Sequence, residues 1–227
     1  MSFIDNEQGP SRDDLLTIGR RLVPHLGDIL DTVEALLPAV NNKTDYRVLN
    51  MGPANGLLID RLLRQHPKIS IHMVSDDFTT AETMRGRLGK FGDRVTFEVG
   101  DFLKVELDGP YDAAILELAT SSLENKSKRT LFSAVYAALR RGGRVIFVSQ
   151  ARGPTETLEA TYNRNWQAMA RAQGATDADF ESSVLSSSKD RTATLATQLD
   201  WLAADGFENV DCFVKYWRFA VLAGDKV

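Results

Sequence analysis

The chain has 227 residues, of which 43% are hydrophobic and 26% charged, and its 27 basic and 31 acidic side chains give a formal net charge of -4. This length suits one large domain whose own core is sufficient for stability. The negative net charge and the lack of any Lys/Arg run longer than two residues disfavour nucleic acid as a partner.

The cysteine content and the hydropathy of the chain bear on disulfides, metal sites and membrane segments. Cys212 is the only cysteine, so we expect no internal disulfide, no Cys-rich zinc site and no bound metal. No stretch of about 18 apolar residues is present, and the first residues lack the basic start and apolar core of a signal peptide. These features predict a cytoplasmic protein with no membrane span.

Residues 1–45 are expected to be mostly helical. Apolar side chains recur at helical spacing over residues 11–37. Pro24 interrupts this pattern, which predicts two helices joined by a bend at residues 22–25. We interpret this part of the chain as an N-terminal helical lid.

From residue 46 to residue 150, short apolar runs alternate with longer segments of helical periodicity. Strands that alternate with helices form βαβ units and a parallel sheet with right-handed crossovers. The predicted strands cover residues 47–51, 69–74, 95–99, 113–118 and 144–149. The predicted helices cover residues 56–65, 79–88 and 126–140.

The rhythm changes after Gln150. Residues 151–190 are polar with scattered aromatic side chains, and we interpret them as an insertion that roofs the substrate pocket. A helix is predicted over about residues 192–204, followed by strands at 210–214 and 219–223. These two strands are too close in sequence for a helical crossover, so we expect an antiparallel hairpin that completes the sheet within residues 191–227.

Two short motifs and this final hairpin carry a resemblance to a known family. The first predicted strand and the turn after it read Arg47-Val-Leu-Asn-Met-Gly-Pro-Ala-Asn-Gly56. The third predicted strand is followed by Gly100-Asp101-Phe102. Together they resemble the class I, Rossmann-like S-adenosylmethionine (SAM)-dependent methyltransferases of the small-molecule type, over roughly residues 21–224. The resemblance implies an α/β fold with a seven-stranded, mostly parallel sheet, a C-terminal antiparallel hairpin and helices on both faces. It also implies that residues 46–150 form the SAM-binding core.

The resemblance assigns a set of residues to SAM. Gly52 and Gly56 would let the backbone pass close to its methionine part. Asn50 stands where the family has an acidic residue, and Ala54 where it has a central glycine. The spacing Gly52-x-x-x-Gly56 differs from a dinucleotide fingerprint, which favours SAM over NAD.

Further cofactor contacts follow from the later motifs. Asp76, or Ser75 in a register shifted by one, would hold the ribose hydroxyls. Asp101 would bind the adenine amino group while Phe102 packs on the ring. Arg21 would meet the SAM carboxylate.

The catalytic residues are the least constrained by the fold. Tyr162 shares a helical face with Trp166 and is a candidate to surround the sulfonium by cation–π attraction. Asn125 and Glu117 are either pocket groups or ordinary cap and surface residues, and Glu117 is included among the cofactor contacts. His25 is the histidine considered as a base.

Three functions remain open at this stage. The first is a SAM-dependent methyltransferase of secondary metabolism that acts on a small molecule. The second is a SAM-cyclising enzyme that forms azetidine-2-carboxylate and releases methylthioadenosine. It is kept because Asn50 is not acidic and because Ser121 or Ser122 stands where related enzymes often have a histidine. The third is a non-catalytic SAM-binding protein. The sequence does not name the acceptor, and a homodimer is left open.

Overall fold

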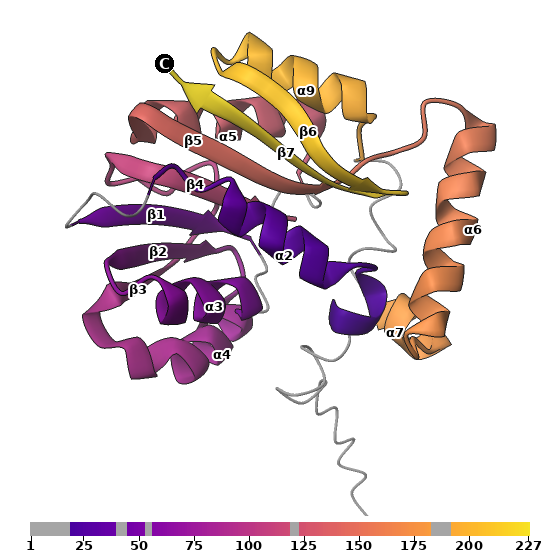
Figure 1. Ribbon diagram of the computed structural model, residues 1–227, viewed down its shortest axis with the longest axis horizontal. Coiled ribbons are helices and arrows are strands. Elements are labelled where there is room, and N and C mark those ends of the chain that lie inside the picture. Colours follow the sequence, from indigo (N-terminus) through magenta and orange to yellow (C-terminus); the bar gives the residue numbers. More distant parts are fainter. Residues whose placement is uncertain (1–18, 40–44, 53–55, 119–122, 183–191) are drawn as a thin grey trace, which may run out of the picture.

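The computed structural model describes residues 19–39, 45–52, 56–118, 123–182 and 192–227. Its centre is a seven-stranded sheet in the order β3-β2-β1-β4-β5-β7-β6 (Figure 1). The strands are β1 (Tyr46–Met51), β2 (Ile69–Ser75), β3 (Val95–Val99), β4 (Tyr111–Glu117), β5 (Leu139–Gln150), β6 (Glu208–Tyr216) and β7 (Phe219–Lys226). β7 pairs antiparallel with both β5 and β6, whereas β1 to β5 pair with one another in parallel. The predicted parallel sheet with a closing hairpin is therefore confirmed.

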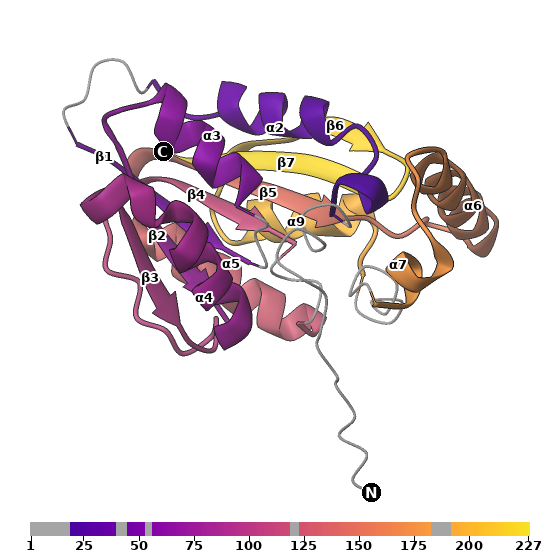
Figure 2. The same cartoon turned by 90° about the horizontal axis from the view of Figure 1, so that it is seen from below.

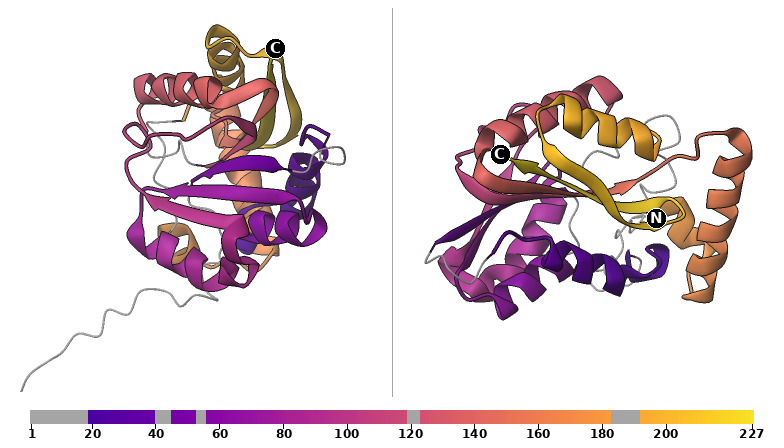
Figure 3. Two further views of the ribbon diagram at one scale, coloured as in Figure 1. Left: turned by 90° about the vertical axis from the view of Figure 1, so that its left-hand side faces the viewer. Right: turned by 45° about the horizontal axis from the view of Figure 1, so that its top comes forward.

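Helices cover both faces of this sheet (Figure 3). They are α2 (Leu26–Ala35), α3 (Leu57–Gln65), α4 (Phe78–Leu88), the 3-10 segment η2 (Gly89–Arg94), α5 (Asn125–Ala138), α6 (Glu156–Ala172), α7 (Asp177–Ser182) and α9 (Leu195–Ala204). One core lies between the sheet and α2, α3 and α4, and contains Val48 and Ile71. The other lies under α5 and α9, and contains Leu49 and Leu116. Neighbouring strand residues such as Val48 and Leu49 thus pack into different cores, because successive side chains of a strand point to opposite faces of the sheet.

The N-terminal segment contributes to the first of these cores. Residues 19–22 are helical and α2 begins at Leu26, so the predicted bend around Pro24 is confirmed. Leu22, Ile29 and Val33 are each at most 2% exposed. The described part of this segment therefore packs on the sheet, and its role as a lid stays a prediction.

Helices α6 and α7 stand beyond the carboxyl ends of the parallel strands (Figure 2). The indole nitrogen of Trp166 on α6 donates to the carbonyl of Leu22 at 2.7 Å. Arg21 forms an ion pair with Asp179 of α7 at 3.3 Å. These contacts join the N-terminal segment to the predicted insertion, although the two are far apart in sequence.

The fifth strand differs from its predicted bounds. It begins at Leu139 instead of residue 144, and the preceding helix ends at Ala138 instead of residue 140. The reason is a bulge: Leu139 pairs with Tyr111, and the register shifts between Tyr111 and Ala113. Because of this irregular pairing, β5 includes Gly142 and Gly143, a pair of residues that the sequence indicates as a turn.

β6 forms one outer edge of the sheet. Its pairing with β7 shifts register between Glu208 and Asp211 and again between Cys212 and Val214. Phe213, inside the second irregularity, is 47% exposed. The outer strand is therefore bent at two places.

A substitution at Gly56 tests the entry to α3. Gly56 is the N-cap of this helix at φ 72°, and an added Cβ would lie 2.8 Å from the sulfur of Met84. We expect Gly56→Ala to lower the free energy of unfolding by about 1–2 kcal/mol, because alanine in the left-handed region is strained. Urea denaturation measures this difference.

Gly27→Ala is the matched control. Gly27 lies in α2 with nothing within 4 Å of its added Cβ, so alanine should leave stability unchanged or raise it. Equal losses of stability in the two variants would contradict the explanation from backbone conformation.

Candidate functional site

The order of the strands places a topological switch point between β1 and β4. These two strands are neighbours, but the chain continues from β1 to β2 on one side and from β4 to β5 on the other. Ligands of open α/β sheets bind at such a switch point, outside the carboxyl ends of the strands. The polar side chains at these strand ends are therefore the candidate site.

Asn50 and Glu117 meet directly at this point. Asn50 on β1 is 0% exposed, and its side-chain nitrogen donates to a carboxylate oxygen of Glu117 at 2.9 Å. The Asn50 side-chain oxygen is buried and has no hydrogen-bond partner among the described residues. Burial raises the pKa of Glu117 from its ordinary value of 4.5 to about 7, and the Asn50 hydrogen bond opposes this shift only in part. The pair thus presents acceptor atoms that suit a cation with N–H donors.

Gly52 follows this pair and bends the backbone away from the strand. Its φ of 134° lies in a region that L side chains rarely adopt. Its N–H donates to the carbonyl of Val74 on β2 at 3.3 Å, which holds the start of the loop beside β2. Pro53 and Ala54, two of the motif residues, lie outside the described residues.

The ends of β2 and β3 bring acidic side chains together. Asp76 follows β2, and burial first, then the charges of Asp77 and Asp101, raise its pKa. Asp77 is instead the N-cap of α4, since its carboxylate accepts from the N–H of Thr80. Ser75 turns its hydroxyl back to the Asp77 carbonyl at 3.0 Å. Of these three neighbouring side chains, Asp76 is thus the carboxylate that is not used as a helix cap.

Asp101 and Phe102 occupy the turn after β3. The N–H of Leu103 donates to the Asp101 carboxylate at 3.0 Å, and this bond together with the Lys104 ammonium lowers the Asp101 pKa. Phe102 is 3% exposed and packs in the core under α5 and α9. Their contacts with adenine stay predictions.

Three other predicted residues lie apart from the Asn50–Glu117 pair. Arg21 is engaged with Asp179 of α7. The His25 ring stacks on Tyr216 of β6, with ring centroids 4.2 Å apart. Asn125 is the first residue of α5 and is exposed. The proposed roles of these residues are not reflected in direct contacts with the pair.

Tyr162 on α6 faces the hairpin formed by β6 and β7. The ammonium of Lys215 lies 3.9 Å from the centre of the Tyr162 ring, and the rings of Tyr162 and Trp217 are 6.3 Å apart. The ring is thus already in contact with a cation of the protein, and its contact with the sulfonium stays a prediction. Ser121 and Ser122 lie outside the described residues.

Sequence reasoning missed a polar cluster at the end of β5. Gln198 of α9 donates to the Gln150 carbonyl at 2.8 Å and contacts the hydroxyl of Ser149. Arg218, between β6 and β7, donates to the side-chain oxygen of Gln150 at 3.0 Å and to Asn163 of α6 at the same distance. The available signal was Ser149-Gln150 at the end of an apolar strand and an arginine between two strands.

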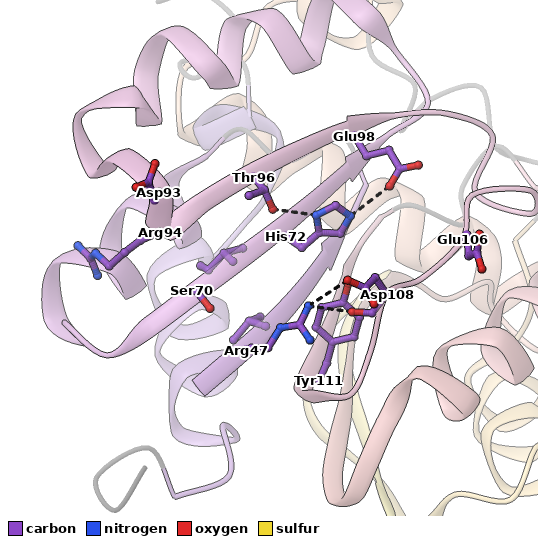
Figure 4. Close-up of a pocket in the computed structure, with 12 residues that line it drawn as sticks. Arg47, Ser70, His72, Asp93, Arg94, Thr96, Glu98, Glu106, Asp108 and Tyr111 are labelled. Carbon is purple, nitrogen blue, oxygen red and sulfur yellow. Dashed lines mark hydrogen bonds and ion pairs between the residues drawn. The ribbon is translucent and has the colours of Figure 1, made fainter. Parts of the chain in front are cut away.

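A separate cavity of about 290 Å³ lies on the sheet face away from α3 and α4 (Figure 4). The connection from β3 to β4 contains no helix, so polar side chains on this face reach solvent. His72 contacts Thr96 at 2.9 Å and Glu98 at 3.3 Å. The cavity is lined by residues of β2, β3 and η2, by the early parts of β1 and β4 and by the connection between β3 and β4, and it does not include Asn50 or Glu117.

The sheet order and the strand-end cluster together define the class I methyltransferase architecture. Residues 30–189 match the O-methyltransferase domain family, and the chain belongs to this family. No group of metal-binding side chains occurs among the described residues. Within those same residues, every helix is too short or too polar to cross a membrane.

Comparison with known proteins agrees with this assignment. An uncharacterized methyltransferase of Anoxybacillus flavithermus is 28% identical over 134 residues, covering 59% of this chain and 60% of that protein. An O-methyltransferase family protein from Burkholderia thailandensis aligns with a TM-score of 0.66 at 16% identity, over 95% of this chain and 59% of its own. Phosphoethanolamine N-methyltransferase 2 of Haemonchus contortus, solved with S-adenosyl-L-methionine, aligns with a TM-score of 0.66 at 14% identity. The alignment covers 99% of this chain and 59% of that protein. The chain thus spans 59% to 60% of the length of these proteins.

The shifted pKa of Glu117 predicts a pH-dependent stability. Between its ordinary value of 4.5 and about 7, the native protein keeps a proton that the unfolded chain releases. The free energy of unfolding should therefore fall by about 2–3 kcal/mol as the pH rises through this window. Urea denaturation at a series of pH values measures it.

Glu117→Gln isolates this contribution, because it keeps the shape of the side chain without the charge. The variant should lack this part of the pH dependence and be at least as stable as the wild type near pH 8. Parallel pH profiles for the two proteins would place the titration at another group.

Proposed function

We propose that this chain binds SAM at the switch point and transfers its methyl group to a small-molecule acceptor in the cytoplasm, as part of secondary metabolism. The observation that carries this proposal is the Asn50–Glu117 pair. The buried amide oxygen of Asn50, which has no partner in the described part of the chain, lies beside a carboxyl group at the place where open α/β sheets bind ligands. Membership of the O-methyltransferase domain family supports the choice of ligand and reaction.

The pair fits the amino acid end of SAM. In this family an acidic residue commonly occupies the position of Asn50, whereas here the carboxyl group lies on the neighbouring strand, 2.9 Å away at Glu117. We infer that Glu117 holds the ammonium group of SAM while the Asn50 oxygen accepts a second hydrogen bond from it. A protein–ligand bond between two charged groups is the stronger kind of hydrogen bond.

The other strand ends fit the adenosine part. Asp76 is proposed to hold the ribose hydroxyls, since one carboxylate can accept two hydrogen bonds. Asp101 is proposed to accept from the adenine amino group, with Phe102 beneath it. Gly52 and Gly56 are proposed to let the backbone approach the methionine part, and Arg21 to meet its carboxylate.

Methyl transfer requires the protein mainly to position the acceptor relative to SAM. When bound, SAM supplies a methyl group activated by the sulfonium, and transfer to an acceptor oxygen breaks the carbon–sulfur bond and releases S-adenosylhomocysteine and a proton. The protein orients the acceptor in line and excludes water. We propose that Tyr162 encloses the sulfonium and that Asn125 lines the pocket. His25 is proposed to remove the proton.

Product analysis tests the reaction directly. The protein is incubated with SAM alone and with phenolic and carboxylic acceptors, and the nucleoside product is identified by mass spectrometry. S-adenosylhomocysteine that appears only with an acceptor is the expected result. Methylthioadenosine formed from SAM alone would show cyclisation instead, and no product with any acceptor would contradict catalysis.

SAM affinity provides a second test, which does not depend on the acceptor. We expect Glu117→Gln to weaken SAM binding about tenfold near pH 7.5, because a charged hydrogen bond is lost. Wild-type affinity should rise as the pH increases from about 6 to about 7.5, while the variant stays flat. Calorimetry at each pH measures both effects.

Two further variants make this test specific. Glu124→Gln removes a charge from the exposed N-cap residue of α5 and should leave affinity unchanged. Asn50→Asp combined with Glu117→Gln returns the carboxylate to β1 across the same hydrogen bond, and should recover most of the affinity. Failure of the combined variant to do so, in a folded protein, would argue against an exchange of roles between the two positions.

A further inference from the structure

Arg218 is a buried cation at the strand-end edge of the sheet. It lies between β6 and β7 and is 6% exposed. Its guanidinium stands over the ring of Trp166, 4.5 Å from the ring centre. Its terminal nitrogens donate to the side-chain oxygens of Asn163 and Gln150, both at 3.0 Å, and its Nε has no partner among the described residues.

Among the described residues, the polar partners of the Arg218 guanidinium are the two neutral amides, and no carboxylate there forms an ion pair with it. Burial lowers the Arg218 pKa, and the charge of Glu159 opposes this shift. Removing a cation from water without pairing it is costly, and such groups are frequent at ligand sites.

Glu159 is also linked to Arg218 through Asn163. The Asn163 side-chain nitrogen donates to Glu159 at 2.9 Å, which turns the Asn163 oxygen toward Arg218. The second carboxylate oxygen of Glu159 accepts from the N–H of Gly153 at 2.6 Å. Glu159 therefore orients the amide that holds the guanidinium, and its own oxygens are engaged elsewhere.

The position of Arg218 assigns it to the acceptor side of the site. Gln150 ends β5, which lies beside β4 and its last residue, Glu117. Asp76 and Asp101 follow β2 and β3, on the opposite side of the β1–β4 switch point. If adenosine lies over β2 and β3, the acceptor approaches from the side of β5 and β7, where Arg218 is.

We propose that Arg218 recognises a carboxylate on the methyl acceptor, and so determines its class as a small organic acid. This inference rests on the proposed methyl transfer. The planar guanidinium matches a carboxylate with two parallel hydrogen bonds. Trp166 and the two amides hold its plane in advance, and the arriving anion supplies a negative charge that no described carboxylate places directly against it.

Binding of matched acids and amides tests the proposal. Acetate, benzoate and 4-hydroxybenzoate are each titrated beside the corresponding amide, with S-adenosylhomocysteine bound, by calorimetry and by the shift in Tm. We expect at least one acid to bind tenfold or more tightly than its amide. Arg218→Met should abolish this preference, and Arg218→Lys, which keeps the charge without the fork, should retain only part of it.

Arg164→Met is the control, because Arg164 is exposed on α6 and the substitution makes the same change in net charge. It should leave the preference intact. Equal binding of acids and amides by the wild type, or an unchanged preference in Arg218→Met, would overturn the proposal. So would a failure of both Arg218 variants to fold, since the guanidinium would then be a structural element.

The same titrations separate this proposal from the one on which it rests. S-adenosylhomocysteine should bind the wild type and Arg218→Met equally. Loss of that binding in the variant would assign the carboxylate to the cofactor and overturn the acceptor assignment. Absence of S-adenosylhomocysteine binding to the wild type would instead contradict the proposed function itself.

Discussion

The divergence of the chain at β1 and β4 is the constraint on which the rest of the site depends. The two strands pair in parallel, and the connections that follow them leave toward opposite edges of the sheet. Asn50 and Glu117, at the carboxyl ends of these two strands, form a hydrogen bond with each other. The acids that follow β2 and β3 lie on one side of this pair, and the polar end of β5 lies on the other. The order of the strands thus separates the candidate contacts to adenosine from the candidate contacts to the acceptor.

The distribution of buried charge follows the same division. At the amino ends of the strands, charged side chains are directly paired: Arg144 with Asp225 at 2.7 Å, and Arg140 with Asp112 at 2.9 Å. At the carboxyl ends, Glu117 has a raised pKa and an amide partner, and Arg218 has a lowered pKa and two amide partners. The two ion pairs lie at the one edge, whereas Glu117 and Arg218 at the other have neutral amides as their hydrogen-bond partners among the described residues. Ligand sites are where such uncompensated charge is expected.

Much of the fold could be predicted from local sequence, because β4 and most of β1 are buried on both faces and their apolar runs have few alternatives. The glycines that begin and end the first loop also carried a clear signal, since Gly52 and Gly56 both have positive φ. The start of β5 could not be predicted, because it depends on a bulge opposite Tyr111 that only the pairing reveals.

The site was predictable only in part, for a related reason. Asn50 and Glu117 were identified separately, from a motif and from a strand end, but their hydrogen bond joins residues 67 positions apart. Arg218 gave no motif, because its environment is built by α6 and β5 together. The predicted helix with Tyr162 and Trp166 was found, yet the sequence did not indicate that these rings contact Lys215 and Arg218 respectively.

The bends in β6 bear on how this protein behaves among copies of itself. An outer strand with regular, unpaired N–H and C=O groups is a template for pairing with another chain and for aggregation. Along β6 the register is broken twice within nine residues, so the spacing of its free backbone groups matches no straight strand. We therefore expect the sheet to end at this edge, and a dimer, where one forms, to associate through side chains rather than through a continuous intermolecular sheet.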